Sequence, residues 1–259
     1  MELGEKSREN KLDEYENLID EALDNGILFN FIVEEEQKFD EFGRRGLLKP
    51  FKKKDDAKNH FLNKKQKNAD PSTVTASFYL QKVLTTPHGS SMLLGFSRKY
   101  ACYNFTIYEN GSANGGCYFW GEKDGKRVAN EICSHVFAYL SQLDRTGDKE
   151  CVHFFCDNCP GQNKNKQMIA MLIHFLGISK VVKNITITYL VPGHTYMPVD
   201  SIHAIIEKKI KKMFIQVPSE WPTILPNARK PPYEIIATKY CSILDWKAVT
   251  SSKKLRHSR

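Results

Sequence analysis

The residues best suited to chemistry lie in the segment CVHFFCDNCPGQNKN, at positions 151–165. The segment opens with a short apolar run of the length expected for a buried strand. Asp157 ends this run, and a Pro160–Gly161 turn then leads into an apolar helical pattern. In α/β folds, ligands bind where strands end and turns lead into helices, so Asp157 is a candidate ligand-binding acid. The alternative is an Asx turn at Asp157 and Asn158 that caps the next helix.

A second group of polar side chains falls in a predicted helix over residues 200–213. At about 100° per residue, we expect Asp200, His203 and Glu207 to share one open face. The opposite face is expected to bury the apolar side chains of Ile202, Ile205, Ile206, Ile210 and Met213. Two structural roles would explain the same acids without a ligand: Asp200 as the helix N-cap, and Glu207 paired with Lys211.

Two of these acids suit a divalent cation. Mg²⁺ and Mn²⁺ prefer oxygen ligands, and carboxylates from Asp157 and Glu207 are expected to supply them. Two such ions can clamp the attacking and leaving oxygens of a phosphoryl displacement. A zinc site is the alternative, because Cys156 and Cys159 are spaced as ligands and Cys151 and His153 lie nearby. No second CxxC or HxxxH follows downstream, which disfavours zinc.

The elements that must position these residues follow from hydrophobic periodicity. Three strands, with Asn-Gly hairpin signals between the last two, precede alternating helices and strands. This βββαβαβα order is typical of a ribonuclease-H-like α/β fold, a mixed sheet flanked by helices. We expect Phe78, Val152, Phe154, Ile187 and Tyr189 on adjacent strands. The predicted strands are 74–80, 100–109, 116–120, 151–156 and 185–191, and the helices are 127–143, 164–176 and 200–213.

The segments around this core differ in composition. Residues 1–48 are predicted to form an acidic helical appendage, with helices at 11–24 and 34–42. Residues 49–70 are lysine-rich and read either as a linker or as a helix along nucleic acid. The core domain is expected at 71–245. From residue 218 onward the chain is expected to be irregular, with an edge strand at 233–238. Residues 246–259 form a basic tail that is expected to fray.

Charge is unevenly spread along the 259 residues, whose net charge is +8. The first 45 residues hold 14 acids and 6 bases, and the other 214 hold 16 acids and 32 bases. A basic body favours a polyanionic partner. No apolar run reaches the length of a membrane span, and the start of the chain shows no secretory signal. The seven cysteines fit reduced thiols, so we expect a nuclear or cytoplasmic protein.

Three separated strings resemble one family: FYLQKVLTTPH, FFCDNCPGQNKN and YLVPGHTYMPVDSIHAIIEKKI. They are similar to the transposon-derived, ribonuclease-H-like integrase domains of animal mobile elements, a domain of unknown function, over about residues 70–245. That family resembles the DDE transposases, in which three acids hold two metal ions for DNA strand cleavage and transfer. The resemblance implies Asp157 as the second acid, Glu207 as the third with Asp200 its competitor, and His194 as the histidine of a Gly-His loop.

The first strand departs from the family. Family members carry Phe-Asp-Leu-Gln where this chain carries Phe78-Tyr79-Leu80-Gln81. The phenol of Tyr79, with an ordinary pKa of about 10, is a poor magnesium ligand at neutral pH. The resemblance therefore implies an impaired site. The alternative is a non-enzymatic nucleic-acid-binding or interaction protein domesticated from a transposon. DNA is the expected partner, and a homo-oligomer is compatible with this class. Candidate DNA contacts are the polar residues after Asp157, namely Asn158, Gln162, Asn163, Lys164 and Asn165.

Overall fold

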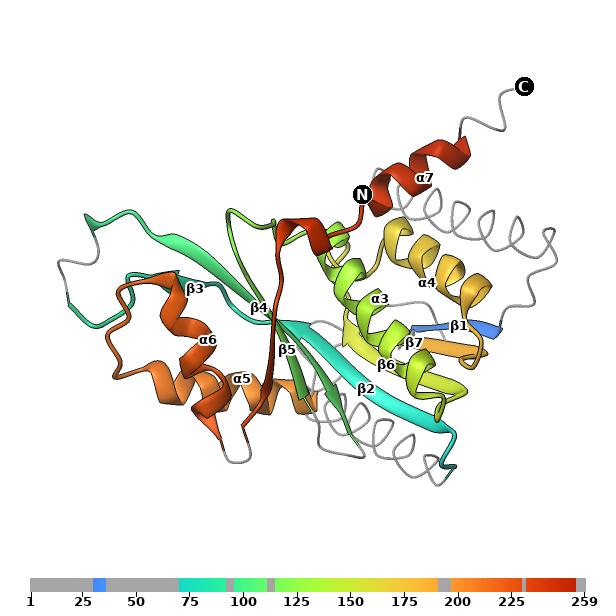
Figure 1. Cartoon of the computed structure of the whole chain (residues 1–259), viewed down its shortest axis with the longest axis horizontal. Helices are drawn as coiled ribbons and strands as arrows, with labels where there is room; N and C mark the ends of the chain where they lie inside the picture. Colours follow the sequence, from blue (N-terminus) through green and yellow to red (C-terminus); the bar gives the residue numbers. More distant parts are fainter. Residues whose placement is uncertain are drawn as a thin grey trace, which may run out of the picture.

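The computed structural model describes residues 30–35, 70–91, 96–110, 115–190, 197–229 and 232–254. Within them, eight strands form one mixed sheet in the order β1-β7-β6-β2-β4-β5-β8, with the short β3 beside β4 (Figure 1). The strands are β1 (Asn30–Glu35), β2 (Thr73–Leu80), β3 (Leu84–Thr86), β4 (Tyr100–Glu109), β5 (Gly115–Gly121), β6 (Cys151–Asp157), β7 (Asn184–Leu190) and β8 (Glu234–Ala237).

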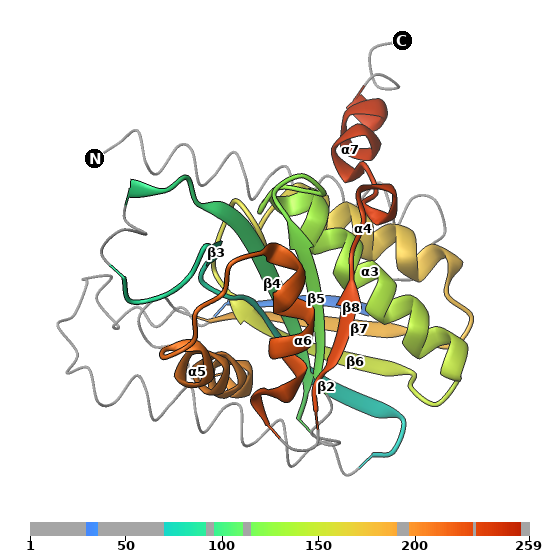
Figure 2. The same cartoon turned by 60° about the vertical axis from the view of Figure 1, so that its left-hand side comes forward.

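Helices cover both faces of this sheet (Figures 1 and 2). The longer helices α3 and α4 pack together on one face, with α7 against them. Helices α5 and α6 lie on the other face, where α5 contacts β2 and β4. No helix among the described residues is long and apolar enough to cross a membrane. The helices are α3 (Ala129–Thr146), α4 (Lys166–Ile178), α5 (Pro198–Ile210), α6 (Trp221–Ile224) and α7 (Trp246–Lys254), with 3-10 turns at Pro218–Glu220, Pro226–Ala228 and Tyr240–Ser242.

Strand β4 runs opposite to the other strands of the described sheet, so strand direction changes twice across it, between β2 and β4 and between β4 and β5. Strands β1, β7, β6 and β2 run parallel to one another, whereas β4 is antiparallel to both β2 and β5. The predicted meander and the predicted β-α alternation are therefore both present. The expectation that Phe78, Val152 and Ile187 lie on adjacent strands is confirmed, because β2 pairs with β6 and β6 with β7.

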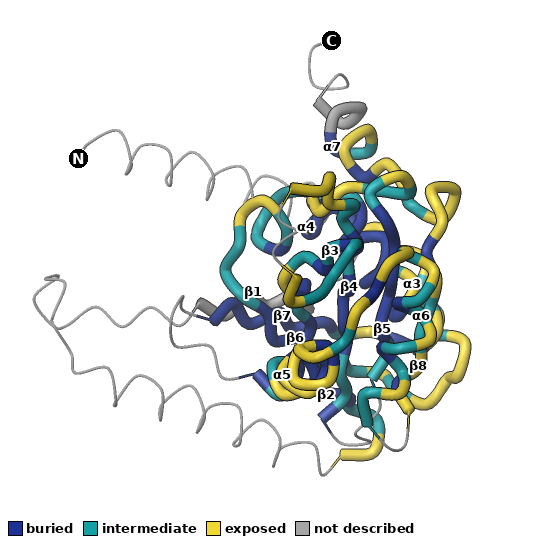
Figure 3. The backbone as a smooth tube through the Cα atoms, turned by 90° about the vertical axis from the view of Figure 1, so that its left-hand side faces the viewer, coloured by how far each residue is buried: buried dark blue, intermediate teal, exposed yellow. Residues whose placement is uncertain are grey.

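Side-chain alternation along β5 divides the core in two. Tyr118 and Trp120 point into the main core under α3 and α4, while Cys117 and Phe119 point into a second core under α5 and α6. Successive residues of a strand face opposite sides of the sheet, so one strand serves both cores. Burying each large apolar side chain contributes about 1.5–3 kcal/mol. Figure 3 shows the buried sheet at the centre and the exposed outer side of α5.

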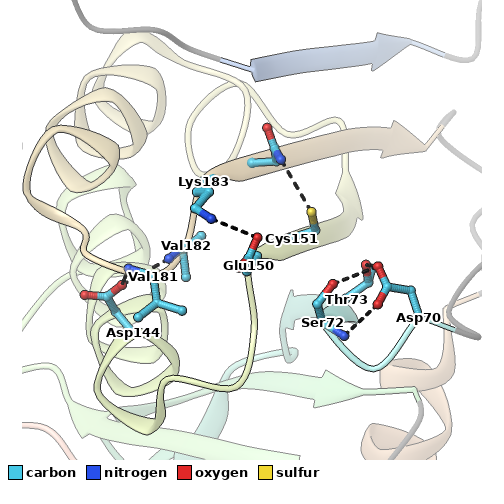
Figure 4. Close-up of polar contacts among 10 residues, drawn as sticks. Asp70, Ser72, Thr73, Asp144, Glu150, Cys151, Val181, Val182 and Lys183 are labelled. Carbon is cyan, nitrogen blue, oxygen red and sulfur yellow. Dashed lines mark hydrogen bonds and ion pairs between the residues drawn. The ribbon is translucent and has the colours of Figure 1, made fainter.

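The end of the sheet where β6 and β7 begin is fastened by polar contacts (Figure 4). Asp144, in the last turn of α3, accepts hydrogen bonds from the backbone N–H groups of Val181 (2.7 Å) and Val182 (3.1 Å). Lys183 pairs with Glu150 at 3.0 Å. These contacts hold the segment between α4 and β7 against α3.

Three features differ from the sequence-based expectations. Residues 30–35, inside the predicted acidic appendage, form the edge strand β1 of the sheet, which pairs with β7; this corrects the start of the helix predicted from residue 34. Trp246 is buried and starts a helix, so the tail does not fray at residue 246. The short strand β3 was not predicted. The predicted helix at 11–24, the lysine-rich segment 49–67 and the hairpin turn at 111–114 lie outside the described residues.

Candidate functional site

Two neighbouring parallel strands carry the residues at the centre of the candidate site. Strands β2 and β6 run in register from Thr73 opposite Cys151 to Ser77 opposite Phe155. Tyr79 and Asp157 each follow two residues later, so they lie side by side on the same face at the carboxyl ends of their strands. On its other side Tyr79 pairs with Thr106 of β4.

Asp157 is half-buried and is held by the turn that follows it. The side-chain amide of Asn163 donates a hydrogen bond to its carboxylate, and the backbone N–H of Cys159 donates another. Burial raises the pKa of Asp157, and the nearby charge of Asp200 raises it further; the two hydrogen bonds oppose this shift only in part. The Asp157 carboxylate is therefore partly removed from solvent and already hydrogen-bonded to the turn that follows it.

Asp200 is the acid that the fold brings to Asp157. It occupies the third position of α5, where its carboxylate accepts the backbone N–H of Met197 at 3.1 Å. The helix N-cap is Met197, so the predicted N-cap role of Asp200 is wrong. Burial raises the pKa of Asp200. The carboxylates of Asp157 and Asp200 both raise the pKa of Tyr79, after burial, which is the largest cause. Tyr79 therefore keeps its proton at neutral pH.

His203 does not lie on the open face of α5, as the sequence analysis expected. Its side chain is buried, and Nε2 lies 3.0 Å from the hydroxyl oxygen of Thr106. At about 100° per residue, Ile206 and Ile210 fall within about 60° of His203, so it shares their buried side. The expected burial of Ile205 is also wrong, because that side chain is exposed.

A buried polar network joins α5 to the sheet below Tyr79. Gln81 donates its side-chain amide to the backbone oxygen of His203 at 3.4 Å and accepts a hydrogen bond from Asn104 at 2.9 Å. The imidazole of His203 lies against the ring of Tyr79, with 5.8 Å between centroids. Burial lowers the pKa of His203 to about 4, so this imidazole is neutral at pH 7. The network fixes the position of α5, and with it Asp200.

Next to this group is an open hollow of about 350 Å³ between α5, the end of β2 and the segment before α3. Two cations that the sequence analysis did not single out, Lys82 and Arg127, form part of its wall. Both lie outside the helices and strands, and Arg127 precedes α3 although the sequence analysis expected it to begin that helix. Asp157 is not among the lining residues, which are Tyr79, Leu80, Gln81, Lys82, Arg127, Asp200, His203, Ala204 and Glu207.

Glu207 lines this hollow together with Asp200, about two helical turns further along α5. It is exposed, and it follows Asp200 by seven residues, or about 10 Å along the helix axis. The fold thus groups Tyr79, Asp157 and Asp200, and it sets Glu207 apart from them. His194 lies outside the described residues.

The polar residues after Asp157 mostly serve the protein itself. Asn163 is 2% exposed and bonded to Asp157, so it is removed from the DNA contact candidates. Asn165 caps α4 by accepting the N–H of Met168 at 3.0 Å. Gln162 donates to the backbone oxygen of Arg127 at 3.4 Å. The ammonium group of Lys164 lies 5.6 Å from the centroid of the Tyr189 ring. Asn158 is half-buried.

The donor groups at this site do not suit two metal ions. Tyr79 supplies a protonated phenol where a third carboxylate would be needed. Over the described residues, no three His, Cys, Asp or Glu side chains are grouped as a metal site, and this includes the cysteines weighed for zinc.

Comparison with solved structures places three transposase complexes among the similar folds. The Mos1 transposase paired-end complex with left transposon end has 13% identity and a TM-score of 0.42, covering 84% of this chain and 67% of that one. A pre-cleavage Mos1 transpososome has 11% identity and a TM-score of 0.45, covering 85% and 65%. The Mos1 strand transfer complex has 13% identity and a TM-score of 0.36, covering 73% and 58%. This chain thus spans about two thirds or less of the length of each.

No curated protein matches the chain. A family model does match, over residues 117–258, which include Asp157, Asp200 and Glu207 but not Tyr79. Because the matched region is more than half of the 259 residues, the chain belongs to the family described as domain of unknown function DUF7869.

Proposed function

We propose that the chain is a transposase-like domain of the ribonuclease-H-like class that binds DNA and has lost two-metal strand cleavage. The observation that carries the proposal is the grouping of Tyr79, Asp157 and Asp200 at the carboxyl ends of adjacent strands and the start of α5. A ligand-binding acid is expected at such strand ends. The β2-β4-β5 meander followed by α3-β6-α4-β7-α5 supports the fold assignment, because it is the element order inferred for this class.

The same grouping favours binding over cleavage. Two-metal phosphoryl transfer needs carboxylates that bridge and flank both ions. Here one of the three positions holds the neutral hydroxyl of Tyr79, and the two acids accept hydrogen bonds from Asn163 and Met197. A domain that retains its basic surface without this ligand set can still hold DNA, since phosphate contacts supply most non-specific affinity.

Charge supports DNA as the partner. Residues 46–259 carry twice as many basic as acidic side chains, 32 against 16. Each phosphate that a lysine or arginine neutralises releases counterions, so binding is expected to weaken steeply with salt. For about four phosphate contacts, affinity should fall roughly 100-fold between about 50 and 200 mM salt.

The test is to measure the affinity of the full chain for labelled duplex DNA across this salt range, and to assay cleavage with Mg²⁺ and Mn²⁺ beside Asp157→Ala. We expect salt-dependent binding and no metal-dependent cleavage in either protein. Absence of binding, or an affinity that does not change with salt, would refute the DNA-binding role. Strong cleavage that disappears in Asp157→Ala would refute the loss of catalysis.

A further inference from the structure

Two cationic side chains in the hollow beside Tyr79 form no ion pair within the part of the chain that the structure describes. Lys82 lies two residues after the end of β2, and Arg127 lies two residues before the start of α3. Both side chains are exposed and line the hollow. Among the described residues, neither forms an ion pair, in contrast to Lys183, which is paired with Glu150. Asp200 and Glu207 also line the hollow, so its attraction for an anion is confined to the part of the wall that Lys82 and Arg127 form.

Tyr79 changes what this hollow can hold. An acid at position 79 would add a negative charge beside Asp157 and Asp200, and a phosphate could approach only with a bridging cation. The phenol is neutral and presents an O–H donor, because burial and the two neighbouring acids raise its pKa. A phosphate oxygen can accept that hydrogen bond. Tyrosine in place of an acid at position 79 thus replaces a metal ligand with a hydroxyl that can donate a hydrogen bond directly to a phosphate oxygen.

The exposed side of α5 continues the basic surface away from the hollow. Ala204, Glu207, Lys208 and Lys211 follow Asp200 at four-, seven-, eight- and eleven-residue steps, which keeps them on one stripe of the helix, with two lysines and one acid. All four are exposed. From Ala204 to Lys211 the stripe extends about 10 Å, enough to pass along a DNA backbone beyond the first phosphate.

We infer that the hollow binds one phosphodiester of a DNA strand directly, through Tyr79, Lys82 and Arg127, and that the strand continues over Lys208 and Lys211 without any divalent cation. The inference rests on the proposed DNA-binding function and names its site. The inference follows from the side chains at the site. They lack the third carboxylate of a two-metal centre, but Tyr79, Lys82 and Arg127 can donate hydrogen bonds to a phosphate.

The experiment measures binding of labelled duplex DNA to the full chain at low salt, once with EDTA and once with Mg²⁺. We expect equal affinity in the two buffers. Lys82→Ala and Arg127→Ala should each weaken binding about 5- to 10-fold, as expected for loss of one charged phosphate contact. Lys180→Ala is the matched control, because Lys180 is also exposed but lies in the loop before β7, at the opposite end of the parallel strands.

Two substitutions at position 79 complete the design. Tyr79→Phe removes only the hydroxyl and should weaken binding in both buffers. Tyr79→Asp should weaken binding strongly in EDTA and recover when Mg²⁺ is added. Circular dichroism establishes that each variant is folded. Dependence of the unaltered chain on Mg²⁺, or equal losses in Lys82→Ala, Arg127→Ala and Lys180→Ala, would overturn this site. Failure of the unaltered chain to bind DNA in either buffer would instead refute the proposed function.

Discussion

At the level of single residues, Tyr79 decides which chemistry the site can perform. Its neighbours Asp157 and Asp200 are in place, and only the third oxygen ligand is missing. A phenol that keeps its proton cannot replace a carboxylate as a ligand for a hard cation. The proposed loss of metal chemistry is therefore assigned to one position, which makes it testable by reversal.

We predict that Tyr79→Asp raises the affinity for Mn²⁺ at least tenfold, because it returns a hard ligand to a site with two acids already present. Calorimetric titration of the unaltered chain and the variant measures this. Tyr79→Phe serves as the control and should bind Mn²⁺ no better than the unaltered chain. Equal, negligible heats in all three proteins would show that the three positions do not form a common site.

Sequence reasoning found Asp157 because a carboxylate at the end of an apolar run is a local signal. It did not find the partner of that carboxylate, Asn163, whose burial results from packing under the turn. It placed His203 on the wrong side of α5, although Ile210 lies within about 20° of it on a helical wheel. Lys82 was not singled out for a different reason: it lines the hollow only because α5 packs nearby, and the sequence around Lys82 does not indicate where α5 lies.

At the level of elements, one carboxylate joins the end of α3 to the start of β7. Besides the N–H groups of Val181 and Val182, which Figure 4 shows, Asp144 accepts a hydrogen bond from the hydroxyl of Ser179 at 2.5 Å. Burial alone would raise its pKa, but these hydrogen bonds lower the pKa to about 2. The ionised form is thus the one that the folded protein stabilises.

We predict that Asp144→Ala lowers the free energy of unfolding at pH 7 by about 1–2 kcal/mol, allowing for partial exposure of the carboxylate. A depressed pKa contributes stability above the ordinary value of 3.8, and this stability is lost as the pH falls through about 2. Denaturant unfolding at pH 7 and in acid should show that the difference in the free energy of unfolding between the unaltered chain and Asp144→Ala becomes smaller as the pH falls. Asp148→Ala, at an exposed position nearby, should have little effect at either pH.

Helix α7 is held to the α3–α4 layer by a buried tryptophan. The ring of Trp246 packs on Phe137 and His174, and its N–H donates to the hydroxyl of Ser134 at 3.3 Å. We predict that Trp246→Ala destabilises the fold by about 3–5 kcal/mol. Trp246→Phe keeps the ring contact and should cost about 1 kcal/mol for the lost hydrogen bond. Thermal unfolding compares the two, and a mild effect of Trp246→Ala would mean that α7 is only loosely attached.

At the scale of the whole molecule, the sheet is assembled from distant parts of the chain. Its central strands were predictable, because each carries its own alternation of apolar and polar residues. Strand β1 was not, since its six residues, NFIVEE, end in acids and its partner β7 lies far along the chain. Helix α7 was missed because its one large apolar residue, Trp246, precedes a mostly polar sequence.

The contribution of β1 can be isolated with two truncated chains, one lacking residues 1–29 and one lacking residues 1–35. Only the second removes the strand that pairs with β7. We predict that it is less stable than the first and self-associates, because an uncovered strand edge offers unpaired N–H and C=O groups. Light scattering and denaturant unfolding provide the comparison. Identical behaviour of the two chains would mean that β1 adds nothing to the sheet.

The pairing of β1 with β7 also implies a delay during synthesis, between the appearance of β1 and that of its partner. Asn30 is opposite Asn184, so the first strand to leave the ribosome must wait for a partner 154 residues later. At roughly 5–20 residues per second, that interval is about 10–30 s. During this time the segment has an apolar start and no strand beside it, while the β-hairpin of β4 and β5 can already close. The chain can therefore begin the centre of its sheet before β1 gains its partner, and β8 joins β5 later still.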